Sequence, residues 1–322
     1  YGADSLSVMR SGARWLTLVS LGWALARWRR LRPRSLLDNA PLEKLLAKMV
    51  PLMRLPRLIQ KGHLTALAVT ASSYSSGEHV TFYESAQAVQ PWVRSQRKAA
   101  RDRITHEHLL ASSAIPFVFP AKGITIDGHT EYFGDGSMRQ SAPIAAAIHL
   151  GAERVLVIGA GRMHEPRGDS AAPPSPSYPS LAQIAGHALS NIFLDALSVD
   201  VERVQRINQT LSLIPEEKRT HSALRPVELL VIAPSQRLDA IAARHVGDLP
   251  GPVRTMLGAL GVTSNMADVR GAALASYLLF EQGYTQELMA LGRADTLARR
   301  ADVCRFFGWK DTGAALRTRL PT

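Results

Sequence analysis

The sequence has a single cysteine, Cys304, among its 322 residues. An internal disulfide is therefore excluded, and so is a zinc site that needs two or more thiolates. One cysteine is typical of proteins from the reducing cytosol, and we expect a cytoplasmic protein, although a secreted protein with few cysteines would have the same composition.

A long apolar run is also missing. The segment from Ala13 to Arg32 has only twelve uncharged residues between Arg14 and Arg27, whereas a membrane-spanning helix needs about 20. Its apolar residues recur at helical spacing, which predicts an amphipathic helix. Such a helix lies either at a lipid surface or against a protein core, and the sequence leaves both open.

Acidic residues are scarce at the start of the chain. Residues 1–61 contain twelve Lys or Arg and three Asp or Glu, while the remainder is close to neutral. A basic segment of this kind suits nucleic acid or anionic lipid. The basic residues are not interleaved with the glycine and aromatic patterns of nucleic-acid-binding modules, so we expect no nucleic-acid partner. The lipid-surface alternative predicts peripheral contact with an anionic membrane through residues 13–34.

The patterns of apolar residues and turn signals predict an α/β protein. Asp127-Gly128 lies between two apolar runs and predicts a hairpin, and the continuous apolar strand Val155–Ile158 is typical of a parallel strand buried on both faces. The predicted helices cover residues 35–48, 103–113, 142–150, 181–213 and much of the last ninety residues. In the first of them Asp38 or Asn39 is the N-cap candidate and Pro41 suits the first turn. The predicted strands cover 64–70, 79–83, 124–126, 131–133, 155–158 and 227–232, and the first two form another hairpin.

Most searches for catalytic motifs give negative results. The turn Gly159–Arg162 is followed by His164 where a dinucleotide fingerprint has Gly or Ala, so we expect no cofactor. His106-Glu107-His108 places two histidines at i and i+2, which predicts a solvated helix face and no metal site. The segment Ser73–Gly77 lacks the first glycine of a nucleophile elbow and leads into a strand where a helix is required, so we reject it as the nucleophile.

Asp135 is the one candidate catalytic residue. It follows the strand Tyr132-Phe133, is flanked by Gly134 and Gly136, and precedes a predicted helix. A carboxylate on a glycine loop at a strand end occupies the usual place of active-site groups in α/β proteins and could act as a general base. Spacing alone favours a plain turn, since Gly-Asp-Gly is frequent in loops.

Several motifs together carry a family resemblance. In order and spacing they resemble the central and C-terminal parts of a bacterial patatin-like phospholipase. They are Leu36–Leu42 (LLDNAPL), Ala111–Pro120 (ASSAIPFVFP), Tyr132–Ser137 (YFGDGS), Ala142–Ile144 (API) and Leu150–Ala152 (LGA), the last leading to the strand at 155–158.

The resemblance implies a three-layer α/β/α patatin-like fold, here with a helical C-terminal extension. It also implies a serine–aspartate dyad that hydrolyses acyl esters of lipids such as phospholipids. The Asp-Gly-Gly or Asp-Gly-Ala motif of the family corresponds to Asp135-Gly136-Ser137, so Asp135 takes the place of the dyad aspartate. Ser137 departs from the family pattern but keeps a small residue there.

The family's glycine-rich oxyanion loop and its Gly-x-Ser-x-Gly nucleophile do not occur in this sequence. We therefore expect a chain truncated at its N-terminus and inactive as given. Residues 1–165 would form the central and C-terminal part of the hydrolase domain, 166–180 a proline-rich loop, 181–235 the helix and strand that complete the domain, and 236–322 a helical region. The alternative is a non-catalytic membrane-associated or scaffold protein that retains the fold.

Overall fold

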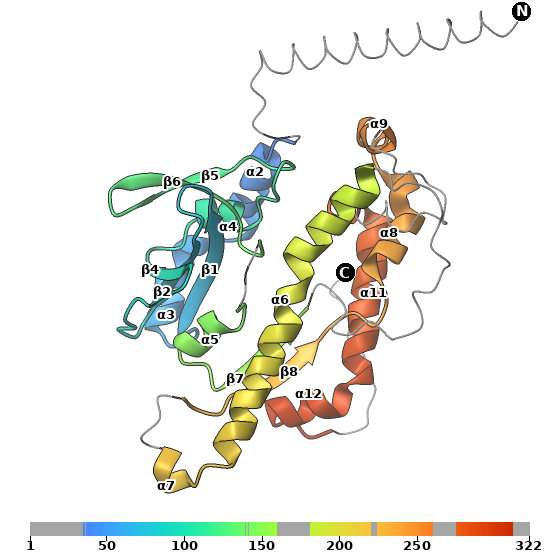
Figure 1. Cartoon of the computed structure of the whole chain (residues 1–322). Helices are drawn as coiled ribbons and strands as arrows, with labels where there is room; N and C mark the ends of the chain where they lie inside the picture. Colours follow the sequence, from blue (N-terminus) through green and yellow to red (C-terminus); the bar gives the residue numbers. More distant parts are fainter. Residues whose placement is uncertain are drawn as a thin grey trace, which may run out of the picture. The chain divides into compact units, whose positions relative to one another are not determined.

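The computed structural model describes residues 35–159 except 36, 139 and 141, and residues 181–219, 224–259 and 275–311. The chain divides into two compact units, of which the first ends at Gly136 and the second begins at Ser137. Figure 1 labels most of the helices and strands of both. The predicted amphipathic helix within 13–34 and the predicted loop 166–180 lie outside the described residues. The boundaries of the four predicted segments stay predictions.

The first unit contains a mixed six-stranded sheet in the order β3-β4-β2-β1-β6-β5. Strand β1 pairs antiparallel with β2 and with β6, and β2 pairs parallel with β4. The strands are β1 (Ala66–Ser73), β2 (His79–Ser85), β3 (Val93–Arg94), β4 (Arg97–Arg101), β5 (Lys122–Ile126) and β6 (His129–Asp135). A mixed sheet with helices confirms the predicted α/β class.

Two hairpins supply the four strands at the centre and at one edge of this sheet. In the β5–β6 hairpin, Asp127 and Gly128 have φ values of 51° and 80°. Both lie in the left-handed region, which a two-residue turn of this kind requires and which Asp and Gly tolerate. The hairpin predicted at Asp127-Gly128 is confirmed, as is the β1–β2 hairpin.

The helices of the first unit are α2 (Ala40–Met49), α3 (Leu55–Gln60) and α4 (His106–Ser112), with the 3-10 helix η1 (Leu52–Arg54) before α3. The predicted start of α2 is confirmed: Pro41 lies in its first turn, and the Asp38 carboxylate accepts a hydrogen bond from the Ala40 N–H at 3.0 Å. Such contacts satisfy N–H groups that have no partner within the helix. Helix α4 packs against β1, β5 and β6.

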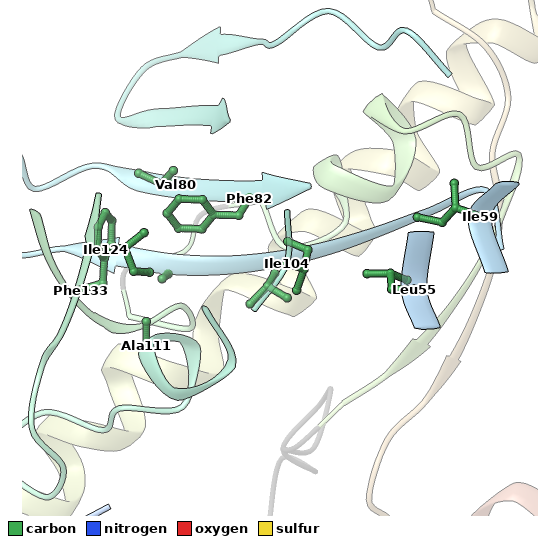
Figure 2. Packing of buried hydrophobic residues seen from close by; sticks show 10 residues of the cluster. Leu55, Ile59, Val80, Phe82, Ile104, Ala111, Ile124 and Phe133 are labelled. Atoms are coloured by element: carbon green, nitrogen blue, oxygen red, sulfur yellow. The ribbon is translucent and has the colours of Figure 1, made fainter. Parts of the chain in front are cut away.

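An apolar core lies between the sheet and the helices (Figure 2). Phe82 of β2 and Phe133 of β6 are fully buried, and their rings meet edge to face with centroids 5.5 Å apart. Leu55 and Ile59 from α3 and Ala111 from α4 belong to the same cluster. Full burial of a phenylalanine contributes about 1.5–3 kcal/mol, so this core holds β6 firmly in the sheet.

The second unit is mainly helical in its described part and contains a two-stranded parallel sheet, β7–β8. This agrees with the predicted helical C-terminal region. Its elements are α5 (Ala145–His149), β7 (Arg154–Ile158), α6 (Leu181–Ser212), α7 (Glu216–Arg219), β8 (Glu228–Ile232), α8 (Leu238–His245), η2 (Val246–Asp248), α9 (Gly251–Ala259), α11 (Gln282–Ala298) and α12 (Arg300–Phe307).

The prediction that the strand at 155–158 is buried on both faces was wrong. No residue of β7 is fully buried; Val155 and Val157 pack toward α6 residues Val201 and Val204, whereas alternate side chains face away and Ile158 is 79% exposed. In a two-stranded sheet one face can pack while the other stays accessible, and a run of apolar letters does not distinguish that case from a buried strand.

Two polar clusters hold the second unit together. The carboxylate of Asp200, buried in α6, accepts hydrogen bonds from the Ile144 N–H at 2.9 Å and from Arg203 at 3.2 Å. It thereby ties α6 to the start of α5.

In the other cluster, His245 donates from Nδ1 to Asp248 at 2.7 Å and from Nε2 to Glu287 at 2.8 Å. These hydrogen bonds raise the pKa of His245, that to Asp248 most, and they help lower the pKa of Glu287, to which Arg244 also donates. The doubly protonated imidazole joins the end of α8 to η2 and α11.

Candidate active site

Asp135 is the last residue of β6 and lies directly opposite Ala71 of β1. Directly opposed residues in an antiparallel pair point to the same face of the sheet, as do residues two apart along a strand. Asp135 therefore shares a face with Ala71 and Phe133, both fully buried, and is itself only 9% exposed. The carboxylate is thus held at the rim of the apolar core.

The loop that follows α4 binds the end of β6. The Asp135 N–H donates to the Ala114 carbonyl at 3.0 Å, and the Gly136 N–H donates to the Ser112 carbonyl at 3.2 Å. The small residues after Ala111 therefore lie against the glycine-flanked aspartate, so that two of the motifs that carry the resemblance are neighbours in space. Their backbone bonds fix the strand end that bears the carboxylate.

Glycine is required at position 136 because β1 passes very close. A Cβ atom there would lie 1.9 Å from the carbonyl oxygen of Thr70 and 3.3 Å from the Ala71 nitrogen, both backbone atoms. At Gly134 a Cβ would instead meet the side chain of Tyr74, at 2.4 Å from its hydroxyl oxygen. The two glycines flanking Asp135 thus let backbone and an aromatic ring pack tightly around it.

Tyr74 is an electrostatic neighbour of the aspartate that the sequence did not indicate. The pKa of its phenol is raised, first by burial and second by the negative charge of Asp135. Its backbone N–H donates to the Tyr132 carbonyl at 2.8 Å, which extends the contact between β1 and β6 beyond the last paired residues. The sequence places Tyr74 in the turn between β1 and β2, but this turn lies near β6 only in the folded sheet.

The structure places Asp135 at the strand end, as predicted, and buries its carboxylate, whereas a plain surface turn would leave it in solvent. The helix expected after it, α5, begins at Ala145. A catalytic role for Asp135 stays a prediction.

The rejected elbow at Ser73–Gly77 is a turn between two strands, as expected. Ser73 is buried; its Oγ donates to Glu131 at 2.7 Å and accepts the N–H groups of Ser75 and Ser76 at 3.1 Å each. The hydroxyl is engaged in the turn, and the chain continues into β2.

The prediction of a solvated face for His106-Glu107-His108 was wrong for His108, which is 3% exposed. Its Nδ1 accepts the Thr105 N–H at 3.1 Å, so the neutral ring carries its proton on Nε2, 3.7 Å from Asp102. Burial lowers the pKa of His108, and this effect outweighs the negative charges of Asp102 and Glu107, which act to raise it. The missed signal is a threonine three residues before a side chain that can accept a hydrogen bond, a variant of the capping box.

Within the described ranges, no group of three or more His, Cys, Asp or Glu side chains could hold a metal ion. Of the helices that the structure describes, none combines the length and apolarity needed to cross a bilayer.

Comparison with known proteins identifies the class. Residues 4–148 match the family model of patatin-like phospholipases, a span that includes Asp135 and the loop bound to it. The mixed sheet with its helices is consistent with the α/β fold of the family that this part of the chain matches. The family is one of lipid acyl hydrolases. No curated protein and no solved structure matches the chain.

Proposed function

We propose that this chain is part of a lipid acyl hydrolase in which Asp135 is the general base of a serine–aspartate dyad. The observation that carries the proposal is the burial of the Asp135 carboxylate at a strand end within the family-matched residues. The close approach of β1 at Gly136 supports it, because a general base must be held in a fixed position to take a proton.

In the proposed reaction, Asp135 accepts the proton of a serine hydroxyl as the serine oxygen attacks the ester carbonyl of a phospholipid or another acyl-ester lipid. Asp135 returns this proton to the departing alcohol oxygen as the C–O bond breaks, and the carboxylate then acts as base for the water that hydrolyses the acyl-enzyme, whose serine oxygen takes the proton back. Backbone N–H groups would stabilise the oxyanion. The sequence contains no Gly-x-Ser-x-Gly, so the nucleophile and oxyanion loop would come from a segment outside it, and the chain as given would be inactive.

The test is ester hydrolysis by the protein expressed from its complete coding sequence, with a short-chain nitrophenyl ester as substrate. Asp135→Asn should lower kcat by a factor of about 10² or more, since it removes the base but keeps the shape. Asp127→Asn is the matched control, because it makes the same change in an exposed turn where Asn tolerates a positive φ.

Circular dichroism should show both variants folded. Unchanged kcat in Asp135→Asn would move the base to another residue. A wild-type protein without esterase activity, or a coding sequence without both glycine motifs, would support the non-catalytic scaffold instead.

We also propose that residues 13–34 make peripheral contact with an anionic membrane. Support comes from the sequence alone, in the excess of Lys and Arg among residues 1–61. Reversing the charges of Arg27, Arg29 and Arg30 should weaken binding to anionic vesicles, and unchanged binding would refute the proposal.

A further inference from the structure

Helix α2 leaves much of its apolar stripe uncovered. It buries none of its residues fully. Leu42 and Leu46 are half-buried, whereas Leu45 and Met49 are 54% and 67% exposed. Since residues four apart lie on one side of a helix, Leu45 and Met49 form a single ridge beside the packed one. Soluble helices ordinarily turn such a stripe fully inward.

Contacts at both ends of α2 hold it in place, so Leu45 and Met49 are exposed on a helix whose position is fixed. Ahead of its start, the Leu37 N–H donates to the Val118 carbonyl at 2.9 Å. At its end, the Val50 carbonyl is 2.8 Å from Nε2 of His106 at the start of α4. These contacts hold α2 alongside α4 and leave the ridge of Leu45 and Met49 exposed.

Basic side chains border this ridge. Lys44 and Lys48 are four residues apart and lie one position before Leu45 and Met49, so they form a parallel ridge on the side away from Leu42 and Leu46. Both lysines are exposed. Across the helix surface, the order is therefore a half-buried apolar ridge, an exposed apolar ridge and a basic ridge.

Helix α3 repeats this order. Leu55 and Ile59 are buried in the core, Leu58 beside them is 41% exposed, and Arg57 lies next to Leu58 on the outer side. Arg54 and Lys61, both exposed, border the same side one turn away in each direction.

The five basic residues of this segment are free to bind a partner. Among the described residues, no hydrogen bond or ion pair engages the side chain of Lys44, Lys48, Arg54, Arg57 or Lys61, and Glu43 is the one acidic residue between positions 40 and 61. Glu43 itself faces Lys122 at 3.5 Å. Each of the two helices thus presents basic and apolar side chains together to solvent.

We propose that the exposed ridges of α2 and α3 bind an anionic phospholipid bilayer. Their cations would contact lipid headgroups, while Leu45, Met49 and Leu58 enter the boundary with the acyl chains. Charge complementarity selects the partner: a phosphate backbone of nucleic acid would pair with the lysines and arginines but offers nothing to the aliphatic ridge, whereas the lipid interface takes both. The residues involved are different from residues 13–34, and the proposal does not depend on the hydrolase reaction.

The experiment measures co-sedimentation of the purified chain with vesicles of phosphatidylcholine containing about one-third phosphatidylglycerol, and with vesicles of phosphatidylcholine alone. The wild type should bind the anionic vesicles far more tightly, and added salt should weaken binding. Lys44→Gln with Lys48→Gln should lower the affinity about 25-fold. Leu45→Gln with Met49→Gln should lower it about tenfold without changing charge.

Helix α11 offers a matched control pair. Met289 and Arg293 are exposed and four residues apart, and the Arg293 side chain forms no hydrogen bond or ion pair with a residue that the structure describes. Met289→Gln with Arg293→Gln should leave vesicle binding unchanged. Thermal unfolding measures the stability of every variant, and gel filtration measures its oligomeric state.

Unchanged binding in both α2 variants would overturn the proposal, and so would an equal loss in the control. If the Leu45 and Met49 variant unfolds well below the wild type, another part of the chain covers the ridge and the proposal fails. If the same variant converts a dimer into a monomer while vesicle binding persists, the ridge is an interface between copies, which also refutes it.

Discussion

Gly136→Ala should disrupt the end of β6 far more than the same change at the other glycine beside Asp135. The added Cβ would lie 1.9 Å from the Thr70 carbonyl oxygen, roughly 1.5 Å closer than nonbonded atoms normally pack. Thr70 cannot retreat easily, because it is paired with Thr81 in the central part of the sheet. The end of β6 must move away instead.

That movement breaks the hydrogen bonds from Asp135 to Ala114 and from Gly136 to Ser112. Overpacking costs about 1–3 kcal/mol and each lost hydrogen bond about 1 kcal/mol, so we expect a loss of about 3–5 kcal/mol in the free energy of unfolding. Gly134→Ala should cost about 1 kcal/mol or less, because the clash is with the half-exposed side chain of Tyr74, which can rotate into solvent.

Urea unfolding of the purified chain measures both losses, and hydrogen exchange at the β1 amides assigns them to the first unit. Gly247→Ala is the control, since its Cβ would meet nothing within 4 Å. Equal effects at positions 134 and 136, or a loss below about 1 kcal/mol at 136, would show that the backbone there yields and would refute the steric argument.

Three further outcomes follow from the buried and paired polar groups. Because burial lowers the folded-state pKa of His108, the unfolded chain binds the proton more readily, and stability should fall as pH drops below about 6.5. In thermal unfolding, His108→Phe should flatten this dependence of stability on pH. His129→Phe, a control at an exposed histidine, should leave it unchanged. The opposite sign holds for His245, whose folded-state pKa is raised. Its contribution to the free energy of unfolding is complete below about pH 6.5 and is lost as pH rises through the folded-state pKa. His245→Gln should therefore destabilise the second unit at pH 6 and have little effect at pH 9. Asp200→Ala should lower the free energy of unfolding by about 2–4 kcal/mol in urea, because it leaves a buried N–H without its acceptor, and a change below 1 kcal/mol would contradict this.

The elements with strong local signals could be predicted from the sequence. Asp127-Gly128 fixed a hairpin because few residues adopt left-handed φ values. Pro41 and Asp38 marked the start of α2 through the unpaired N–H groups of a first turn. Asp135 could be singled out because a carboxylate between two glycines at a strand end combines a chemical group with a backbone signal.

Features that depend on distant partners could not be predicted. The steric need for glycine at 136 comes from Thr70, and the burial of His108 comes from packing of α4 on the sheet. One face of β7 is open because its sheet has two strands, and the sequence of a single strand does not reveal how many strands its sheet contains. In each case tertiary contacts override what the local pattern favours.

The sheet order also bears on when the aspartate acquires its place during folding. The β1–β2 and β5–β6 hairpins join neighbouring stretches of chain and can close rapidly, whereas β1 and β6 meet through a few pairs between residues far apart in sequence. We expect docking of the second hairpin on the first to be the slow event. A nascent chain would then pass through a stage in which all four strands exist while Asp135 is still exposed to water, and Asp135 would become buried only when the hairpins lock together.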